Sequence, residues 1–327
     1  MNDITSSLLS RFGTRLKQNE LLSKHTNFRI GGPARWYLEA KTEADVMDAW
    51  KIAHENSVPV FVLGGGSNTL APDEGYPGLV IQIAMRDISI DGQDVVADAG
   101  ALSVAVARQT GKAGLSGMEW AISLPGTIGG AVRGNAGCFG GETKDRLVSA
   151  RVLREGKVVE MSKKDLDFHY RHSSIKGTND IVLSAKFHLE KGDADELQKK
   201  MEEILGKRKA SQPMSAGSAG CMFKNCELAA GSSKLAAMIE KKIPLPNNCP
   251  LPAARCQLPA GWLIDQAGLK GLRIGDAQIS DVHGNFVVNL GKATAEDVMA
   301  VVHKAKETVK EKFGIELEEE VQLIAQG

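Results

Sequence analysis

Residues 124–132 read LPGTIGGAV and are followed by NAG at 135–137, and this stretch decides the fold. Two similar clusters precede it, RIGGP at 29–33 and GGGSN at 64–68. Successive glycines let a chain turn its backbone N–H groups toward an anion and approach a diphosphate closely. Three such clusters therefore indicate a site for a phosphate-containing ligand, although any one of them alone is more often only a tight turn.

The common nucleotide-binding signatures are missing from these clusters. None matches the dinucleotide fingerprint G-x-G-x-x-G between a strand and a helix, and none matches the phosphate-loop pattern G-x-x-x-x-G-K-[ST]. The two most frequent nucleotide-binding folds are therefore not supported.

Composition and charge are those of an ordinary globular protein. The 327 residues are 43% hydrophobic and 24% charged, enough to bury two or three compact cores. Forty basic residues balance forty acidic ones, so no overall field attracts nucleic acid or an anionic membrane. We expect neither as a partner. With no export signal and no apolar run long enough to span a membrane, we expect a cytoplasmic protein.

The cysteines do not form a metal-binding pattern. They stand at positions 138, 221, 226, 249 and 256, without the close paired spacing of a structural zinc site. We therefore expect free thiols and no bound metal.

The pattern of apolar residues predicts an α+β protein. Strands are predicted in 58–64, in three short runs between 78 and 99, in a hairpin at 148–161 with a Glu-Gly turn, at 181–190 and at 315–324. Helices are predicted at 43–56, 101–112, 193–210 and 294–314. Thr294 is the expected N-cap of the last helix, with Asp297 three residues on and Gly314 at its end.

The order of the motifs resembles that of UDP-N-acetylenolpyruvoylglucosamine reductases. The matching segments are TNFRIGGPA (26–34), VLGGGSN (62–68), GMEWAISLPGTIGGAV with NAG (117–137), YRHS (170–173), GCMFKN (220–225), AGWLID (260–265) and LEEEV (317–321). Each motif is weak alone, but chance does not place so many in one order along most of the chain. About fifty residues separate YRHS from GCMFKN, which resembles the shorter type of the family, without an extra loop over the substrate.

The resemblance implies an FAD-binding fold of the vanillyl-alcohol-oxidase type in two subdomains, plus a C-terminal α+β substrate-binding domain. The first subdomain would be 1–84 and would also receive the strand 314–327, the second 85–210, and the substrate-binding domain 211–313. The residues expected at the FAD are Arg29, Gly31, Gly64, Gly65, Gly66, Ser67, Asn68, Gly126, Thr127, Gly129, Gly130, Asn135 and Gly137.

The implied reaction is the reduction of UDP-N-acetylenolpyruvoylglucosamine to UDP-N-acetylmuramate in peptidoglycan precursor synthesis. NADPH reduces the flavin, whose N5 gives hydride to C3 of the enolpyruvyl group, and C2 then takes a proton. The expected partner is this UDP-sugar, and we expect a monomer.

Three residues match the family's catalytic positions. Arg171 of YRHS suits the stabilisation of an enolate by charge and bidentate geometry. Cys221 stands where most of the family has serine, and we interpret it as the proton donor because a thiol, with an ordinary pKa of about 8.5, is protonated at neutral pH. A thiol beside a flavin also predicts inactivation by peroxide. Glu320 is the expected acidic partner and rests on the match alone, because three further glutamates crowd 316–319.

The substrate-binding residues are also taken from matched motifs. They are Tyr170, Lys224, Asn225, Lys270, His283 and Asn285. Lysines near 224 and 270 suit a diphosphate, although each is also typical of a surface, and the DVHGNF segment at 281–286 suits hydrogen bonds to the sugar or uracil. His283 is the weaker choice.

Two departures from the family pattern leave questions open. A segment at about 226–258 is interposed after GCMFKN. One interpretation is a surface excursion; the other is a cover for the substrate site, in which Cys226, Cys249 and Cys256 would be redox-sensitive or bind metal. Leu235, Met238 and Ile239 predict one face of a short helix there. Arg133-Gly134 replaces a bulkier apolar pair and puts the local flavin contact in doubt. The alternatives to a reductase are a flavin oxidase or dehydrogenase of the same superfamily and a flavin-free nucleotide-sugar sensor.

Overall fold

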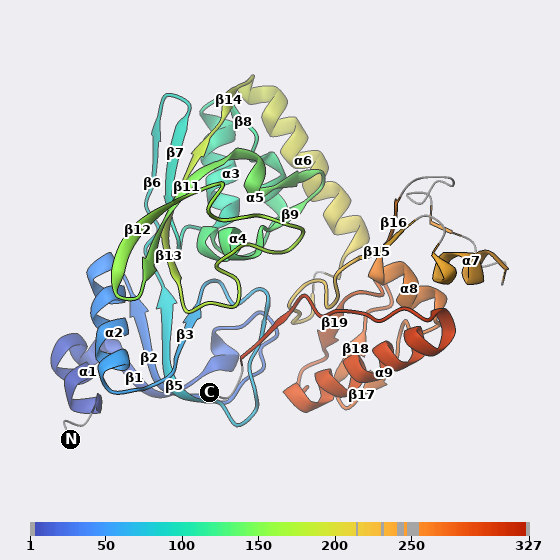
Figure 1. Cartoon of the computed structure of the whole chain (residues 1–327), viewed down its shortest axis with the longest axis horizontal. Helices are drawn as coiled ribbons and strands as arrows, with labels where there is room; N and C mark the ends of the chain where they lie inside the picture. Colours follow the sequence, from blue (N-terminus) through green and yellow to red (C-terminus); the bar gives the residue numbers. More distant parts are fainter. Residues whose placement is uncertain (1–3, 214, 230–231, 241–244, 247–254, 325–327) are drawn as a thin grey trace.

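The computed structural model describes residues 4–213, 215–229, 232–240, 245–246 and 255–324. Its three largest sheets follow one another along the chain, as the colours of Figure 1 show. The N-terminal part builds a four-stranded sheet, the middle a five-stranded sheet and the C-terminal part a three-stranded sheet. Within the described ranges, no helix has the length and apolar character needed to cross a membrane.

The N-terminal part contains α1 (Ile4–Phe12), η1 (Gly13–Arg15), β1 (Leu16–Leu21), η2 (Leu22–Lys24), β2 (Pro33–Ala40), α2 (Glu43–Glu55), β3 (Val60–Leu63), β4 (Thr69–Leu70) and β5 (Tyr76–Ile83). Its sheet has the order β1-β2-β5-β3, with β2 and β3 both parallel to β5. The crossover helix α2 begins at Thr42, whose hydroxyl accepts from Asp45 N, and buries Val46, Ala49 and Ala53. This arrangement ends β3 at the GGGSN cluster.

The middle part contains β6 (Ile88–Asp91), β7 (Asp94–Asp98), α3 (Ser103–Lys112), β8 (Leu115–Ser116), η3 (Glu119–Ser123), α4 (Ile128–Gly134), β9 (Gly137–Cys138), β10 (Gly141–Glu142), α5 (Thr143–Arg146), β11 (Leu147–Arg154), β12 (Lys157–Ser162), β13 (Ile181–His188), β14 (Glu190–Lys191) and α6 (Ala194–Ser211). The antiparallel sheet has the order β12-β11-β13-β7-β6. Its buried side chains belong to the same hydrophobic cluster as those of the first sheet, so the two parts share one core.

The C-terminal part contains β15 (Cys226–Ala229), α7 (Ser233–Glu240), β16 (Arg255–Leu258), α8 (Ala260–Gln266), β17 (Arg273–Ile274), β18 (Ala277–Ile279), β19 (Val287–Asn289), α9 (Ala295–Phe313) and β20 (Gln322–Leu323). A second hydrophobic cluster fills it, with α9 burying Val298, Val301, Val302, Ala305 and Val309. Phe28, Ile30 and Leu70 of the N-terminal part join this cluster. The parts on either side of the candidate site are therefore packed together.

Most of the predicted elements are confirmed. The helices predicted at 43–56, 101–112, 193–210 and 294–314 appear as α2, α3, α6 and α9, and the hairpin predicted at 148–161 appears as β11 and β12. The capping box of Thr294 and Asp297 is present, and Gly314 takes the left-handed conformation at φ +68.

The long final strand is a wrong prediction. Alternation of apolar and acidic residues at 315–324 suggested one continuous strand, but only β20 is regular, and it pairs in parallel with β4. Before it, Glu319 makes a single bridge to Phe223. The segment runs from the end of α9 back to the N-terminal part, as Figure 1 shows, so its alternate apolar side chains pack into a core without a long partner strand.

The interposed segment is partly regular. It begins with β15 and ends with β16, which pair antiparallel, and α7 lies between them. Leu235 and Met238 are buried as predicted, whereas the prediction for Ile239 is wrong because its side chain is 47% exposed. Of this segment, residues 230–231, 241–244 and 247–254 lie outside the described residues, and Cys249 is among them.

The start of α9 is held by a carboxylate from the N-terminal part. Asp73 Oδ1 and Oδ2 accept from Ala295 N at 2.9 and 2.8 Å, and Oδ2 also accepts from Glu296 N at 3.3 Å. A negative charge on otherwise unpaired N–H groups stabilises a helix N-terminus. This contact therefore couples the N-terminal part to the stability of α9.

We predict that Asp73→Ala lowers the free energy of unfolding by about 1 kcal/mol, the usual cost of losing a cap. Asp73→Asn, which keeps an acceptor oxygen without the charge, is the matched variant and should lose less than half of that. Urea unfolding followed by circular dichroism measures both. Equal stability of Asp73→Ala and the unchanged protein would contradict the prediction.

Candidate functional site

Two of the glycine clusters lie in contact with each other. The loop 64–68 follows β3, and Ser67 Oγ donates to Pro125 O at 3.1 Å in the loop before α4. A Cβ atom added to Gly64 would lie 2.6 Å from Thr127 Oγ1, a contact that real side chains do not make. The two loops therefore approach each other through bare backbone, as the sequence predicted for a ligand site.

The segment that leads into the third cluster contacts the other side of the same loop. Asn27 N donates to Gly66 O at 2.9 Å. Gly66 has φ +61, and a Cβ atom there would lie 2.0 Å from His25 O, so only glycine fits. Arg29 and Gly31 follow with φ +58 and +134, and the Arg29 side chain is exposed. The structure thus brings all three clusters together.

The assembled loops suit an anionic group. The backbone N–H groups of Gly65, Gly66, Ser67 and Asn68 have no acceptor within the part of the chain that the structure describes. The buried Thr127 Oγ1 likewise has no hydrogen-bond partner. Unpaired buried polar atoms are costly unless a ligand or water satisfies them. These residues fit the diphosphate of a dinucleotide cofactor.

A chain of hydrogen bonds that the sequence did not predict ends on the backbone of the loop 64–68. Glu20 Oε1 lies 3.0 Å from His25 Nε2, and His25 Nδ1 lies 2.9 Å from Tyr37 OH. Tyr37 OH donates to Gln82, whose Nε2 donates to Gly64 O at 3.3 Å. Burial raises the pKa of Tyr37, so its hydroxyl stays a donor. No sequence pattern marks this chain, because its members come from η2, β1, β2 and β5.

The remaining predicted FAD residues surround α4. Gly126 lies before it and Gly130 within it, and Gly129 N donates to Ala99 O at 2.8 Å. Asn135 ends α4 in the left-handed conformation and is fully buried. Its Nδ2 donates hydrogen bonds to Glu142 Oε2 and His169 O, and its Oδ1 accepts one from Lys144 N. The polar atoms of this side chain are therefore all bonded within the protein. Direct contact of Asn135 with the cofactor stays a prediction.

Arg171 and Glu320 meet across the site. Arg171 Nε lies 2.7 Å from Glu320 Oε1, an ion pair in which the N–H is not aligned for a hydrogen bond. Another guanidinium nitrogen donates to Gly137 O at 2.9 Å. Burial raises the pKa of Glu320 even though Arg171 opposes the shift. Asn68 Nδ2 donates to Glu320 O at 3.1 Å, which ties the pair to the glycine loops.

Cys221 lies beside this pair. Cys221 forms an isolated antiparallel β-bridge with Phe286. The carbonyl oxygen of its neighbour Met222 accepts a hydrogen bond from Glu320 N at 2.8 Å. The thiol keeps some exposed surface, yet burial raises its pKa to about 12, with the charge of Glu320 adding to the shift and Arg171 opposing it. The three residues matched to catalytic positions are therefore brought together from three separate segments.

Three of the residues predicted to bind substrate form one group. Asn225 N donates to Tyr170 OH at 3.3 Å, and Asn225 Oδ1 accepts from Ala260 N at 3.1 Å at the start of α8. Lys224 Nζ pairs with the exposed Glu318. This group lies next to Arg171, since Tyr170 precedes it in the chain and the guanidinium lies 5.0 Å from the Tyr170 ring centre.

Lys270 and His283 lie at the other side of α8. Lys270 Nζ pairs with Asp265 at 3.0 Å, and burial together with the charge of Lys270 lowers the pKa of His283. The His283 ring packs against Phe286 and against Gly261 of α8, where a Cβ atom would lie 2.9 Å away. The glycine of AGWLID is thus explained by this ring.

Asn285 is used inside the protein. Its Oδ1 accepts from Phe223 N at 2.9 Å, its Nδ2 donates to Phe223 O at 2.8 Å, and its side chain is buried. These bonds hold the strand segment that carries Cys221. The predicted contact of Asn285 with substrate is not tested by this geometry.

Two cations near Arg171 were missed at the sequence level. Lys176 Nζ donates to Arg171 O at 2.8 Å, and the guanidinium of Arg133 donates to carbonyls of the loop that contains Lys176. Arg133 had been noted only as a departure, and Lys176 follows YRHS by three residues. A lysine so close to a matched motif was the available signal.

The expectation of free thiols is wrong for one cysteine. Cys256 is disulfide-bonded, whereas Cys138, Cys221 and Cys226 are free. Among the described residues no group of three His, Cys, Asp or Glu side chains is arranged to hold a metal ion.

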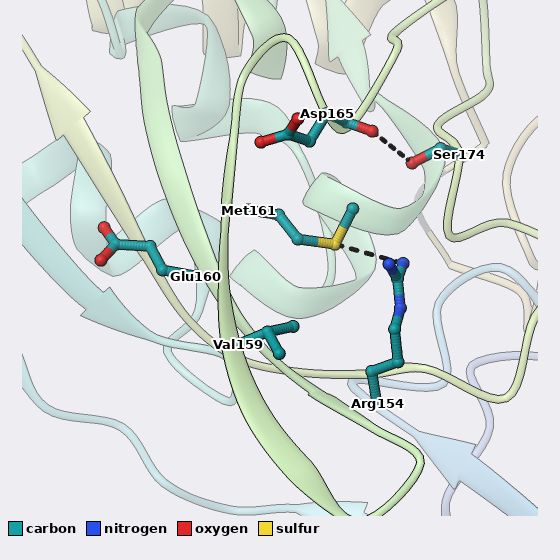
Figure 2. A pocket seen from close by; sticks show the side chains of 6 residues that line it. All are labelled: Arg154, Val159, Glu160, Met161, Asp165 and Ser174. Carbon is teal, nitrogen blue, oxygen red and sulfur yellow. Dashed lines mark hydrogen bonds between the residues drawn. The ribbon is translucent and has the colours of Figure 1, made fainter.

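A separate hollow lies on the β11–β12 hairpin, shown in Figure 2. Arg154 donates there to Met161 Sδ at 3.4 Å, and Ser174 Oγ donates to Asp165 O at 2.9 Å. Its polar groups bond one another, and none of the matched motif residues lines it, so we do not assign it a role.

Known proteins resemble this chain over nearly its whole length. UDP-N-acetylenolpyruvoylglucosamine reductase of Clostridium novyi (strain NT) is 36% identical over 313 residues, covering 95% of this chain and 92% of that protein. The Agathobacter rectalis protein of the same name is 39% identical over 326 residues, covering 95% and 94%.

A solved structure has the same fold. The crystal structure of UDP-N-acetylenolpyruvylglucosamine reductase from Thermus caldophilus aligns with a TM-score of 0.74 at 34% identity, covering 94% of this chain and 98% of that one. Residues 34–162 match the model of an FAD binding domain, and residues 212–324 match the C-terminal domain of UDP-N-acetylenolpyruvoylglucosamine reductase. The predicted fold class, an α+β FAD-binding fold with a C-terminal domain, is confirmed. The chain belongs to the UDP-N-acetylenolpyruvoylglucosamine reductase family.

Proposed function

We propose that this protein is an FAD-dependent oxidoreductase that uses NADPH to reduce UDP-N-acetylenolpyruvoylglucosamine to UDP-N-acetylmuramate in peptidoglycan precursor synthesis. The observation that carries the proposal is the convergence of Arg171, Cys221 and Glu320 beside the glycine loops. We further propose a cytoplasmic monomer of the shorter family type, divided at 1–84 with 314–327, 85–210 and 211–313.

Arg171 is proposed to bind the carboxylate end of the substrate. When bound, FAD supplies the hydride that the enolpyruvyl group receives. Arg171 keeps its charge, because Glu320 offsets the effect of burial and the pKa of the guanidinium is raised overall. A fixed cation beside the enolate lowers the energy of the charge that develops there. Glu320 orients Arg171 through their ion pair.

Cys221 is proposed to give the proton to C2. Its pKa of about 12 keeps the thiol protonated across the physiological range. It is, however, a weaker acid than the ordinary thiol assumed from sequence, and the enolate must supply the driving force for the transfer. Oxidation requires the thiolate, so we now expect Cys221 to resist peroxide, contrary to the expectation from sequence.

The sugar nucleotide is proposed to lie along α8. Lys224 and Lys270 stand on two sides of this helix and suit the diphosphate, and Tyr170 and Asn225 lie between Lys224 and Arg171. Asn225 and Lys270 contact residues of α8, Tyr170 contacts Asn225, and Lys224 pairs with Glu318, two residues before Glu320.

Anaerobic stopped-flow absorbance tests the reaction and its proton donor. NADPH should bleach the flavin in the unchanged protein, and the enolpyruvyl sugar should restore its colour. In Cys221→Ala, bleaching should keep its rate, while restoration should slow by about 100-fold or more, the scale of lost general acid catalysis. Cys221→Ser, which restores a hydroxyl, should recover much of the rate. Restoration by oxygen but not by the sugar would favour an oxidase.

The raised pKa of Cys221 predicts its reactivity. Because the protonated thiol persists to high pH, alkylation by iodoacetamide should be slow at pH 8 and should still rise about tenfold per pH unit at pH 10. Mass spectrometry of the peptide containing Cys221 distinguishes it from the other free cysteines. A rate that levels off near pH 8.5 would show an ordinary thiol and contradict the assignment of the pKa.

The contact between the glycine loops predicts a selective effect on FAD binding. In Gly64→Ala the added Cβ forces Thr127 away, and we expect FAD affinity to fall by about tenfold or more, equivalent to about 1.4 kcal/mol. In Gly134→Ala no atom lies within 4 Å of the added Cβ, so affinity should be unchanged. Fluorescence titration of the FAD-free proteins measures both, and equal affinities would remove these loops from the cofactor site.

A further inference from the structure

The backbone of Arg171 is in an unusual conformation. Its φ is +55, in the left-handed region that residues with a side chain seldom occupy. Such a conformation is strained for a residue with a side chain and persists only where the surroundings impose it. The direction in which the Arg171 guanidinium leaves the chain therefore depends on whatever holds this backbone.

Lys176 contacts that backbone directly. The chain folds back after Arg171, and the half-buried Lys176 places Nζ 2.8 Å from Arg171 O. A charged donor to a carbonyl makes a stronger hydrogen bond than a neutral one. Burial and the charge of Lys224 lower the pKa of Lys176, which agrees with an ammonium group enclosed by the site.

Arg133 fixes the segment that carries Lys176. Its guanidinium donates to Ile175 O at 2.8 Å and to Thr178 O at 3.0 Å, on both sides of Lys176 in the chain. In return Ser173 Oγ donates to Arg133 O at 2.6 Å. The end of α4 and the loop 173–178 therefore hold each other by three hydrogen bonds, and Lys176 has little freedom to move.

The far end of Arg171 is anchored to the same region. Its guanidinium donates to Gly137 O at 2.9 Å, four residues beyond Arg133, and pairs with Glu320. Both the carbonyl and the guanidinium of Arg171 are thus tied to the segment after α4, one of them through Lys176. The turn 169–172 also encloses Arg171, since His172 N donates to His169 O at 3.2 Å and His169 N to His172 O at 3.1 Å. Removing the Lys176 contact would leave this turn and the guanidinium contacts to hold the strained backbone, without a donor on the Arg171 carbonyl.

We propose that Lys176, fixed by Arg133, is a positioning residue that holds the strained backbone of Arg171 and so aims its guanidinium at the reacting end of the substrate. This inference rests on the proposed function, in which Arg171 stabilises the enolate. It also gives Arg133, a departure from the family pattern, a role in supporting the loop.

The test compares the two half-reactions in the holoenzyme. In Lys176→Met, bleaching of the flavin by NADPH should stay within about twofold of the unchanged protein, whereas restoration by saturating enolpyruvyl sugar should slow by about 10- to 100-fold, the scale of a misplaced catalytic group. Lys176→Arg, which keeps a cationic donor, should recover most of the rate. Lys157→Met removes an exposed lysine at the start of β12 and should change neither half-reaction.

Binding measurements separate positioning from direct substrate contact. The dissociation constant of UDP-N-acetylmuramate, measured by calorimetry, should change by less than about threefold in Lys176→Met, well under the 1.4 kcal/mol of a tenfold loss. A large loss of affinity with an unchanged rate at saturation would make Lys176 a substrate ligand and overturn the inference. If Lys176→Met does not retain FAD, Arg133→Lys, which cannot reach both carbonyls, should show the same selective slowing in milder form.

Failure of the inference and failure of the function give different results. If the unchanged protein is restored by the sugar and both Lys176→Met and Arg133→Lys match its rate, the positioning role is wrong and the function stands. If the sugar restores none of the proteins, the proposed function is wrong, and the inference is overturned with it.

Discussion

The close approach of two glycine loops is the constraint on which the site depends. Gly64 follows strand β3 of the N-terminal part and Thr127 precedes helix α4 of the middle part, and their loops meet where even a methyl group would collide. Because the N-terminal and middle parts share one hydrophobic core, this approach is fixed by packing far from the loops. The free N–H groups after Gly64 are then held in place before any ligand arrives. Preorganisation of this kind avoids the cost of ordering a loop on binding.

The arrangement of Arg171, Cys221 and Glu320 depends on a second constraint. After α9 the chain runs back to the N-terminal part. Glu320 reaches Arg171 only because β20 pairs with β4, directly after the loop 64–68. The same segment after α9 also brings Glu320 N into a hydrogen bond with Met222 O, next to Cys221 in the chain. One short segment therefore fixes the position of Glu320 relative to both partners, and Asn68 ties its carbonyl to the glycine loop. The length of β20 matters less than its register.

Sequence predicted what is local or repeated as a motif. The helices were predictable because caps such as Thr294 and apolar periodicity act within a few residues, and the convergence of the matched motifs followed from family resemblance. Two sets of hydrogen bonds were not predictable: those that lead from Glu20 to Gly64, and those from Arg133 to the loop 173–178. Both join residues distant in sequence through ordinary polar side chains. The strand predicted at 315–324 was wrong because alternation indicates only that every second side chain is buried. An extended chain without a partner strand shows the same alternation.

The electrostatics of the site favour proton donation over nucleophilic attack. A nucleophilic cysteine needs a lowered pKa, normally from a nearby cation or a helix N-terminus. At Cys221 the charges of Arg171 and Arg208 favour the thiolate, but Arg171 is paired with Glu320 and burial dominates, so the pKa rises to about 12. The pKa of Glu320 is raised by the same burial. The Cys221 thiol, whose neutral form is favoured, can release its proton only to a strong base, and an enolate formed at Arg171 is such a base. A serine in place of Cys221 would meet the same requirement, because its hydroxyl is also protonated and also needs a strongly basic acceptor.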